Sequence, residues 1–113
     1  MLKGEIWRAK LQNPIASEPG YKRPILIIQS DHFNRSKIKT VICVTITKNL
    51  NIASSPGNVL LNKNDSNLNI KSVINISQII TLDKSFLLNC IGTVNKNILK
   101  KVDEGLKLVL EIN

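Results

Sequence analysis

The chain has 113 residues, of which 42% are hydrophobic, and its 16 Lys and Arg residues against 8 carboxylates give a formal net charge of +8. This length suits one domain, residues 1–113, and leaves too little chain for two separate cores. No apolar run approaches the roughly 20 residues that a membrane-spanning helix needs. Glu5 also stands where a secretion signal would need apolar residues, so we expect a cytoplasmic protein.

The positive charge is concentrated in the first part of the chain. Residues 1–48 carry nine Lys or Arg against three carboxylates, whereas residues 49–113 carry seven against five. A basic surface of this kind favours a polyanionic partner. The alternative is an AT-rich genome, because Lys, Asn and Ile are all abundant. The N-terminal half is therefore the predicted face for nucleic acid.

The first half of the sequence predicts three strands separated by polar segments. Residues 4–11 alternate in polarity and predict a strand, whereas residues 12–21 contain two prolines and a glycine and predict a loop. The continuous apolar run within residues 23–29 predicts a strand buried on both faces. Residues 31–39 form a polar, basic connection, and residues 40–47 predict the third strand.

The second half predicts shorter strands between longer loops. Residues 48–57 form a loop that ends in a Pro-Gly turn, residues 59–62 a short strand, and residues 63–71 another polar loop. Residues 72–76 predict a strand that continues, after Ser77 and Gln78, into residues 79–81.

Helical patterns come late in the chain. Asp83 is placed to cap a short helix over residues 84–88, and residues 91–94 predict a last strand. Residues 96–110 have a clear helical period, in which Gly105 is expected to mark a close packing contact. The apolar stripe of this helix comprises Ile98, Val102, Leu106 and Val109, with Leu99 and Leu110 beside it. Short strands followed by one amphipathic helix predict a mainly β fold, a small barrel closed by the terminal helix.

No residue pattern predicts a metal or a cofactor. The sequence has no Walker loop, no GxGxxG and no GxSxG, and its cysteines, Cys43 and Cys90, lack CxxC spacing. Both are expected to be buried free thiols among apolar neighbours. His32, the lone histidine, is either a general acid or base or an ordinary loop residue.

Two residues combine suitable chemistry with a defined position. Arg23 directly precedes a proline where a loop becomes a strand, and its guanidinium offers a fork of donors that fits two phosphate oxygens. Thr47 ends the third predicted strand, where its hydroxyl is able to donate to a phosphate. The alternatives are a solvated surface arginine and a strand threonine chosen for packing.

An ordered series of segments resembles the MazF/PemK family of toxin endoribonucleases, from bacterial toxin–antitoxin pairs. The likeness runs nearly end to end. Its segments are Gly4-Glu5-Ile6-Trp7, Asn13-Pro14-Ile15-Ala16-Ser17-Glu18, Arg23-Pro24-Ile25-Leu26-Ile27-Ile28-Gln29, Phe33-Asn34-Arg35, Val44-Thr45-Ile46-Thr47, Pro56-Gly57-Asn58-Val59, Ser77-Gln78-Ile79, Thr81-Leu82-Asp83-Lys84 and Lys101-Val102-Asp103-Glu104-Gly105-Leu106.

The resemblance implies an SH3-like barrel, a homodimer and metal-independent cleavage of single-stranded mRNA at a short sequence. The implied products carry a 2′,3′-cyclic phosphate and a 5′-hydroxyl, and a cognate antitoxin protein would inhibit the reaction. By position, Arg23 and Thr47 match the catalytic arginine and threonine of the family. The residues expected to contact RNA are Ser17, Glu18, Tyr21, Lys22, Lys48, Ser77 and Gln78. No metal and no cofactor are expected.

The chain departs from the family pattern at two places. Ala16 replaces a frequent glycine in the first loop, which restricts the backbone there. Asn75 and Ser77 occupy positions where some branches carry an arginine and an aspartate proposed as acid and base. The resemblance therefore provides residues for charge stabilisation and none for proton transfer.

Two other functions are compatible with the same predicted barrel. One is a protein-binding toxin like the related CcdB gyrase poisons, which depend on the end of their C-terminal helix. The other is an RNA-binding relative without catalysis. The presence of both Arg23 and Thr47 favours the nuclease.

Overall fold

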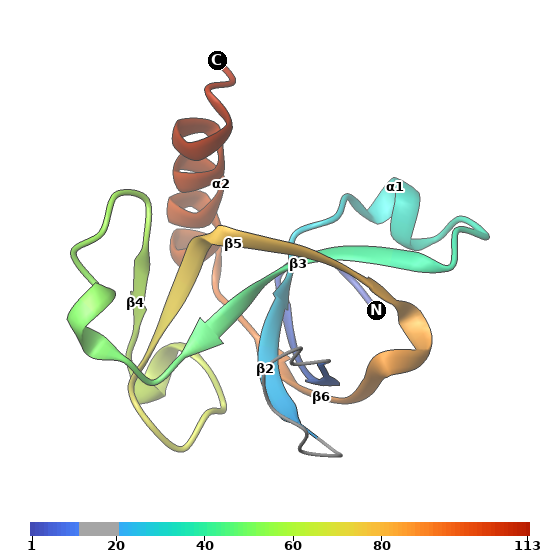
Figure 1. Ribbon diagram of the computed structural model, residues 1–113, viewed down its shortest axis with the longest axis horizontal. Coiled ribbons are helices and arrows are strands. Elements are labelled where there is room, and N and C mark those ends of the chain that lie inside the picture. The colour runs from blue at the N-terminus through green and yellow to red at the C-terminus, as the bar shows by residue number, and fades with distance from the viewer. Residues whose placement is uncertain (12–20) are drawn as a thin grey trace.

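The computed structural model describes residues 1–11 and 21–113, and Figure 1 shows a curled sheet with one long helix beside it. The predicted loop at residues 12–21 falls almost wholly outside the described residues. The elements in chain order are β1 (Glu5–Lys10), β2 (Lys22–Ile27), α1 (Asp31–Asn34), β3 (Thr40–Thr47), β4 (Val59–Leu61), β5 (Ser72–Asp83), β6 (Leu87–Thr93) and α2 (Lys96–Leu110). Three single 3-10 turns lie at Leu50–Ile52, Lys63–Asp65 and Lys84–Phe86.

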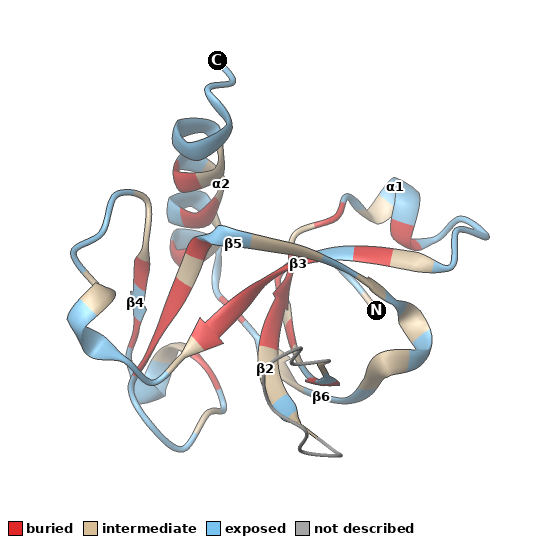
Figure 2. Cartoon of the chain, viewed as in Figure 1, coloured by how far each residue is buried: buried red, intermediate tan, exposed pale blue. Residues whose placement is uncertain are grey.

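The six strands form one antiparallel sheet in the order β4-β5-β3-β2-β1-β6. The sheet curls into a half-barrel, and its central strands carry most of the buried residues, as Figure 2 shows. Ile25, Leu26 and Ile27 of β2 are all fully buried, which confirms the prediction that this strand is covered on both faces. The mainly β fold class with a terminal helix is thus confirmed.

Helix α2 covers one face of the sheet along most of its length. The Asn95 side chain caps its start by accepting a hydrogen bond from the Ile98 N–H at 2.9 Å. Ile98 and Val102 are buried, but Val109 and Leu110 are 42% and 52% exposed. Leu106 also packs against the core, so the predicted apolar stripe contacts it along most of the helix. Only the last turn, with Val109 and Leu110, projects beyond the sheet (Figure 1).

Gly105 makes the close contact that its position in the helix predicted. An added Cβ at Gly105 would lie 2.5 Å from the carbonyl oxygen of Gly57, which is backbone and unable to move aside like a side chain. The glycine lets α2 rest directly on the turn that ends the 48–57 loop. The loop is thereby held against the helix.

Strand β5 continues through Ser77 and Gln78, as the sequence predicted, but it extends to Asp83 rather than ending at residue 81. Thr45 pairs with Asn75 while the preceding residue, Val44, pairs with Ile79. Residues 76–78 therefore fall between two successive pairs and form a bulge, which bends the strand without ending it.

Three other predictions need correction. Residues 31–39 were expected to be a connection only, but α1 forms there because Ser30 caps it and Asn34 is buried against Gln29, to which it is hydrogen-bonded at 3.0 Å. Strand β6 starts at Leu87, earlier than predicted, since pairing with β1 extends it. Cys43 is buried as expected, whereas Cys90 is exposed on β6, an edge strand with β1 as its single neighbour in the sheet.

Candidate functional site

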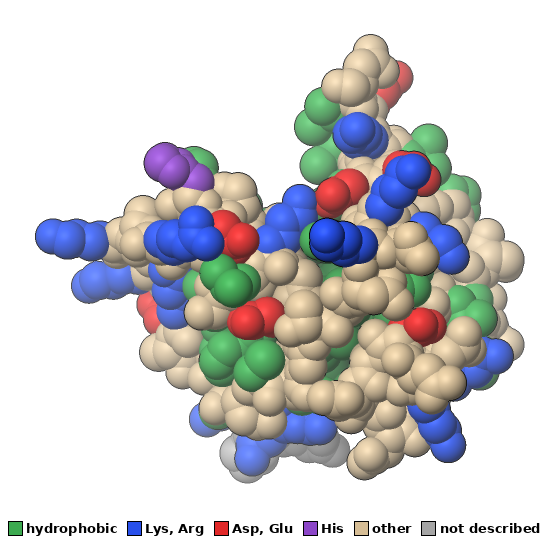
Figure 3. Space-filling model, turned by 180° about the vertical axis from the view of Figure 1, so that it is seen from behind, with side chains coloured by type: hydrophobic (Ala, Val, Ile, Leu, Met, Phe, Trp, Pro, Cys, Tyr) green, Lys and Arg blue, Asp and Glu red, His purple; other side chains and the backbone are tan. Residues whose placement is uncertain are grey.

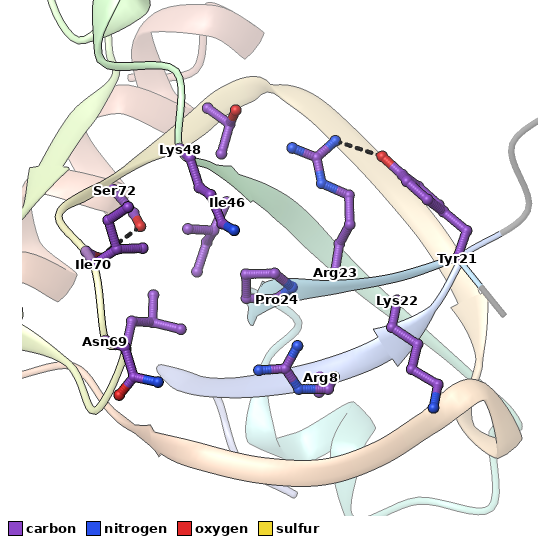
Figure 4. A pocket seen from close by; sticks show the side chains of 12 residues that line it. Arg8, Tyr21, Lys22, Arg23, Pro24, Ile46, Lys48, Asn69, Ile70 and Ser72 are labelled. Atoms are coloured by element: carbon purple, nitrogen blue, oxygen red, sulfur yellow. Dashed lines mark hydrogen bonds between the residues drawn. The ribbon is translucent and has the colours of Figure 1, made fainter.

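A pocket of about 520 Å³ opens beside the ends of β2 and β3 (Figure 4). Strand ends and the loop before β5 meet here, so the lining combines rigid backbone with polar side chains. The residues that line the pocket are Arg8, Tyr21, Lys22, Arg23, Pro24, Ile46, Thr47, Lys48, Leu68, Asn69, Ile70 and Ser72.

Arg23 is held in a defined position within this pocket. Its Nη1 donates a hydrogen bond to the Tyr21 hydroxyl at 2.9 Å, and its guanidinium carbon lies 5.8 Å from the centre of the Tyr21 ring. Pro24 follows it and restricts the Arg23 backbone to an extended conformation, and Figure 4 shows the guanidinium extending beside the tyrosine. Tyr21 accepts from one guanidinium nitrogen, and within residues 1–11 and 21–113 the other Arg23 side-chain donors are available to a ligand.

Thr47 lines the same pocket as Arg23, from the neighbouring strand β3. The paired part of β2 and β3 ends at Ile25 with Thr45, and Arg23 and Thr47 each lie two residues beyond this pair. The Thr47 Oγ1 accepts a hydrogen bond from the Asn49 N–H at 3.2 Å. Among the described residues no acceptor is hydrogen-bonded to the Thr47 hydroxyl, so its hydrogen is available to a ligand there. The two predicted catalytic residues lie in one pocket, on neighbouring strands.

The pocket is strongly cationic. Four of its lining residues, Arg8, Lys22, Arg23 and Lys48, are basic, and within the described residues 1–11 and 21–113 no carboxylate or histidine lines it. Hydroxyl groups and the Asn69 amide add neutral hydrogen-bonding capacity. A pocket of this kind suits a ligand with several negative charges and polar edges, such as a polynucleotide.

The other predicted RNA contacts are distributed unevenly. Tyr21, Lys22 and Lys48 line the pocket, whereas Ser77 and Gln78 are exposed on the β5 bulge and do not. Gln78 Oε1 accepts hydrogen bonds from the buried Thr45 hydroxyl and, at 3.4 Å, from Asn75 Nδ2. Ser17 and Glu18 lie outside the described residues.

Arg8 and the 68–72 segment are lining residues that the sequence reasoning missed. For Arg8 a signal existed: alternation along the first strand puts Arg8 on the face opposite the buried Ala9, next to the strand that carries Arg23. For Leu68, Asn69 and Ile70 no sequence pattern pointed to the site. They belong to a polar loop whose position depends on the whole sheet.

The remaining basic residues of the N-terminal half lie elsewhere. Arg35, Lys37 and Lys39 are exposed in the segment after α1, and Figure 3 shows basic side chains near the single histidine at that corner. His32 is exposed on α1, with its ring edge against the Phe33 ring, and does not line the pocket.

Within residues 1–11 and 21–113, no three His, Cys, Asp or Glu side chains gather as a metal site. In the same part of the chain, no helix has the length and apolar character to cross a membrane.

A second, apolar groove of about 420 Å³ lies between α1, the middle of the sheet and the end of α2. Several of its side chains are unusually exposed for apolar residues, including Phe33 at 52% and Ile42 at 40%. The lining residues are Ile28, Gln29, Ser30, Phe33, Ile42, Ile79, Leu106 and Leu110.

The family match and the similar protein sequences point to the same family. Residues 2–110 match the family described as PemK-like, MazF-like toxin of type II toxin-antitoxin system. The chain is 41% identical over 110 residues to Endoribonuclease MazF2 of Mycobacterium bovis, covering 97% of this chain and 96% of that protein. Endoribonuclease MazF6 of Mycobacterium tuberculosis is similar to the same extent.

Solved structures share the fold at lower sequence identity. An endoribonuclease in complex with its cognate antitoxin, from a mycobacterial species, superposes with a TM-score of 0.82 at 23% identity, over 100% of this chain and 97% of that one. The Mycobacterium tuberculosis toxin MazF-mt6 gives a TM-score of 0.79 at 18% identity, over 96% and 98% of the two chains.

Proposed function

Because this chain belongs to the PemK-like, MazF-like toxins of type II toxin–antitoxin systems, we propose that the pocket of Arg23 and Thr47 is its active site. The chain is an endoribonuclease toxin, inhibited by a cognate antitoxin. The observation that carries the site assignment is that Arg23 and Thr47 line one cationic pocket from neighbouring strands.

The proposed reaction is an internal transesterification of RNA. The 2′-oxygen loses its proton and bonds to the adjacent phosphorus while the bond to the 5′-oxygen breaks, and that oxygen gains a proton. The products are a 2′,3′-cyclic phosphate and a 5′-hydroxyl, and no water is consumed. Negative charge builds on the non-bridging oxygens, where the Arg23 fork and the Thr47 hydroxyl stabilise it. We propose that this chemistry needs no metal ion.

Arg23 stabilises the negative charge that develops on the phosphate and does not act as the general base. A guanidinium keeps its proton in proteins and is therefore a poor proton acceptor. The hydrogen bond from Arg23 to Tyr21 limits its rotation before RNA arrives. A fixed cation of this kind lowers the barrier because little reorganisation accompanies the reaction.

The proposed substrate is single-stranded mRNA, and we therefore propose that the protein acts in the cytoplasm. Unpaired bases are open to hydrogen bonds along their edges, and polar groups of the flanking loops would read a short sequence. Lys22 and Lys48, both exposed at the pocket, would contact the backbone. We include Ser17, Glu18, Ser77 and Gln78 as contacts along the continuing strand of RNA.

We propose a homodimer with the RNA groove at its interface. The apolar groove that contains Phe33 and Ile42 is proposed as one part of the face offered to the second copy, because exposed apolar patches are typical of association sites. Sedimentation should give a dimer at micromolar concentration, and Phe33→Ser with Ile42→Ser should shift it toward monomer. A wild-type monomer would refute the dimer and leave the active-site assignment standing.

The antitoxin is proposed to compete with RNA for the cationic pocket. An acidic or amphipathic segment would match the four basic lining residues. In this arrangement inhibition would weaken as ionic strength rises.

The test of the proposed function is cleavage of a long mixed-sequence RNA in EDTA, with the ends mapped chemically. We expect cleavage at few sites with cyclic phosphate ends, and a loss of about 10²–10³-fold for Arg23→Ala. Arg35→Ala is the matched control, because Arg35 is an exposed arginine outside the pocket. Intact RNA with the wild-type protein would refute nuclease activity and support the binding-only or gyrase-poison alternatives.

A further inference from the structure

Arg8 is a pocket residue with no role in the reaction described above. It lies on β1 opposite Pro24 of β2, while its neighbour Ala9 is buried and pairs with Arg23. Alternation along the strand therefore sends Arg8 to the opposite face of the sheet from Ala9. Its exposed side chain still lines the same pocket as Arg23.

The two arginines reach this pocket from different sides of β2. Figure 4 shows Pro24 between them, with the Arg8 guanidinium on one side and the Arg23 guanidinium on the other. Lys48, which follows Thr47 at the end of β3, has its ammonium group on the same pocket wall as Ile46 (Figure 4). The cationic groups are thus spread along the pocket and do not converge on one point.

Arg8 is also unpaired in the part of the chain that the structure describes. Among residues 1–11 and 21–113, no hydrogen bond or ion pair of the Arg8 guanidinium is formed, and no carboxylate lines the pocket. The neighbouring carboxylate on β1, Glu5, is engaged by the Leu2 N–H at 2.8 Å and the Trp7 indole N–H at 3.0 Å. An exposed arginine that has no partner among the described residues and lies in the proposed active-site pocket is able to offer its fork to the substrate.

We propose that Arg8 binds an RNA phosphate adjacent to the one that Arg23 and Thr47 act on. The inference rests on the proposed active site and deepens it. One phosphate is held at the reacting position, and the next is held on the other side of Pro24. Arg8 therefore positions the RNA strand, so that the reacting phosphate stays beside Arg23 and Thr47. A phosphate contact carries no sequence information, so Arg8 would strengthen binding of all sequences alike.

The test is equilibrium binding, which separates this inference from catalysis. Fluorescein-labelled 2′-O-methyl oligonucleotides of uridine and of adenosine serve as probes, because they lack the nucleophilic hydroxyl and stay intact. Binding is measured by anisotropy over about 50 to 200 mM salt. The variants are Arg8→Gln, which removes the charge, and Arg8→Lys, which keeps it. Arg35→Gln is the matched control outside the pocket.

We expect Arg8→Gln to weaken binding of both oligonucleotides by a similar factor. The slope of log affinity against log salt should decrease by about one. Arg8→Lys should keep the slope, and Arg35→Gln should match the wild type in both quantities. In cleavage assays Arg8→Gln should raise KM more than it lowers kcat.

Two results would overturn the assignment. An unchanged affinity and slope for Arg8→Gln would remove Arg8 from the RNA site. A loss confined to one of the two oligonucleotides would make Arg8 a base-reading residue and exclude the phosphate contact. If the wild type binds RNA but does not cleave it, the nuclease proposal fails while this binding result stands on its own.

Discussion

The Arg23 guanidinium donates a hydrogen bond to the Tyr21 hydroxyl at 2.9 Å, and the same ring lies 5.8 Å from the guanidinium carbon. Tyr21 therefore restrains Arg23 in two ways, through its oxygen and through its aromatic face. An RNA contact was the predicted role of Tyr21. The geometry adds a positioning role, which kinetics separate from substrate binding.

Tyr21→Phe should lower kcat by about fivefold and leave KM nearly unchanged. The substitution removes one hydrogen bond, worth about 1 kcal/mol, and keeps the ring against the arginine. Single-turnover cleavage measures kcat directly. In the Arg23→Ala background the same change should have little further effect, because both residues act through one group. A rise in KM with kcat intact would instead make Tyr21 an RNA-binding residue.

Thr47→Val should lower kcat by about 10²-fold, whereas Thr47→Ser should stay within severalfold of the wild type. Valine keeps the shape of the side chain and removes the donor aimed at the developing charge. The hydroxyl of serine retains both that donor and the oxygen that accepts from the Asn49 N–H. Equal activity of the valine and serine variants would exclude Thr47 from charge stabilisation.

Gly105→Ala should destabilise the fold although alanine favours helices. The gain in helix propensity is about 1 kcal/mol, while forcing a methyl group against the Gly57 carbonyl costs about 1–3 kcal/mol. Urea denaturation measures the difference in the free energy of unfolding, provided that the slope of this free energy against urea concentration is the same for both proteins. Glu104→Ala, at an exposed position of α2, is the matched control and should be nearly neutral. A stabilised Gly105→Ala protein would show that the 48–57 loop moves away from the helix at little cost.

Asp31 should make folding sensitive to acid. Its Oδ1 accepts hydrogen bonds from the Lys3 N–H at 2.7 Å and from Asn34 Nδ2 at 3.1 Å, and the Lys3 bond is the largest cause that lowers the pKa of this carboxyl below its ordinary value. Because the folded state favours the ionised form, the contribution is present above the unfolded pKa. It is lost as pH falls through the lower, folded pKa.

Asp31→Asn should therefore be less stable than the wild type near neutral pH, and the difference should shrink in acid. Chemical denaturation at several pH values measures it. A difference that stays constant down to acid pH would mean that the carboxylate charge contributes nothing to folding.

The two thiols should react at very different rates. Burial raises the pKa of the Cys43 thiol to about 12, which keeps it protonated as well as inaccessible. Cys90 is exposed on β6, although partial burial and the Glu5 charge also raise the pKa of its thiol. A thiol reagent should modify one cysteine per native chain, and Cys90→Ser should abolish that reaction. Two rapidly modified thiols would contradict the buried state of Cys43.

The regular elements follow largely from local pattern. Strand β3 and helix α2 have the predicted bounds, Thr40–Thr47 and Lys96–Leu110, because alternation and helical period span the whole of each segment. The short helix α1 was missed, since its stability comes from the buried contact between Asn34 and Gln29 rather than from a repeating apolar pattern. The start of β6 was missed because pairing with β1 extends the strand.

The sequence by itself determined the mainly β class, the terminal helix and the choice of Arg23 and Thr47 as candidate residues. Only the tertiary structure decided that these two residues share a pocket, that Arg8 and Asn69 line it, and that Cys90 is exposed. The reason is physical. Periodicity records which face of an element is buried, but the register and curl of the sheet decide which side chains, distant in sequence, meet at its edge.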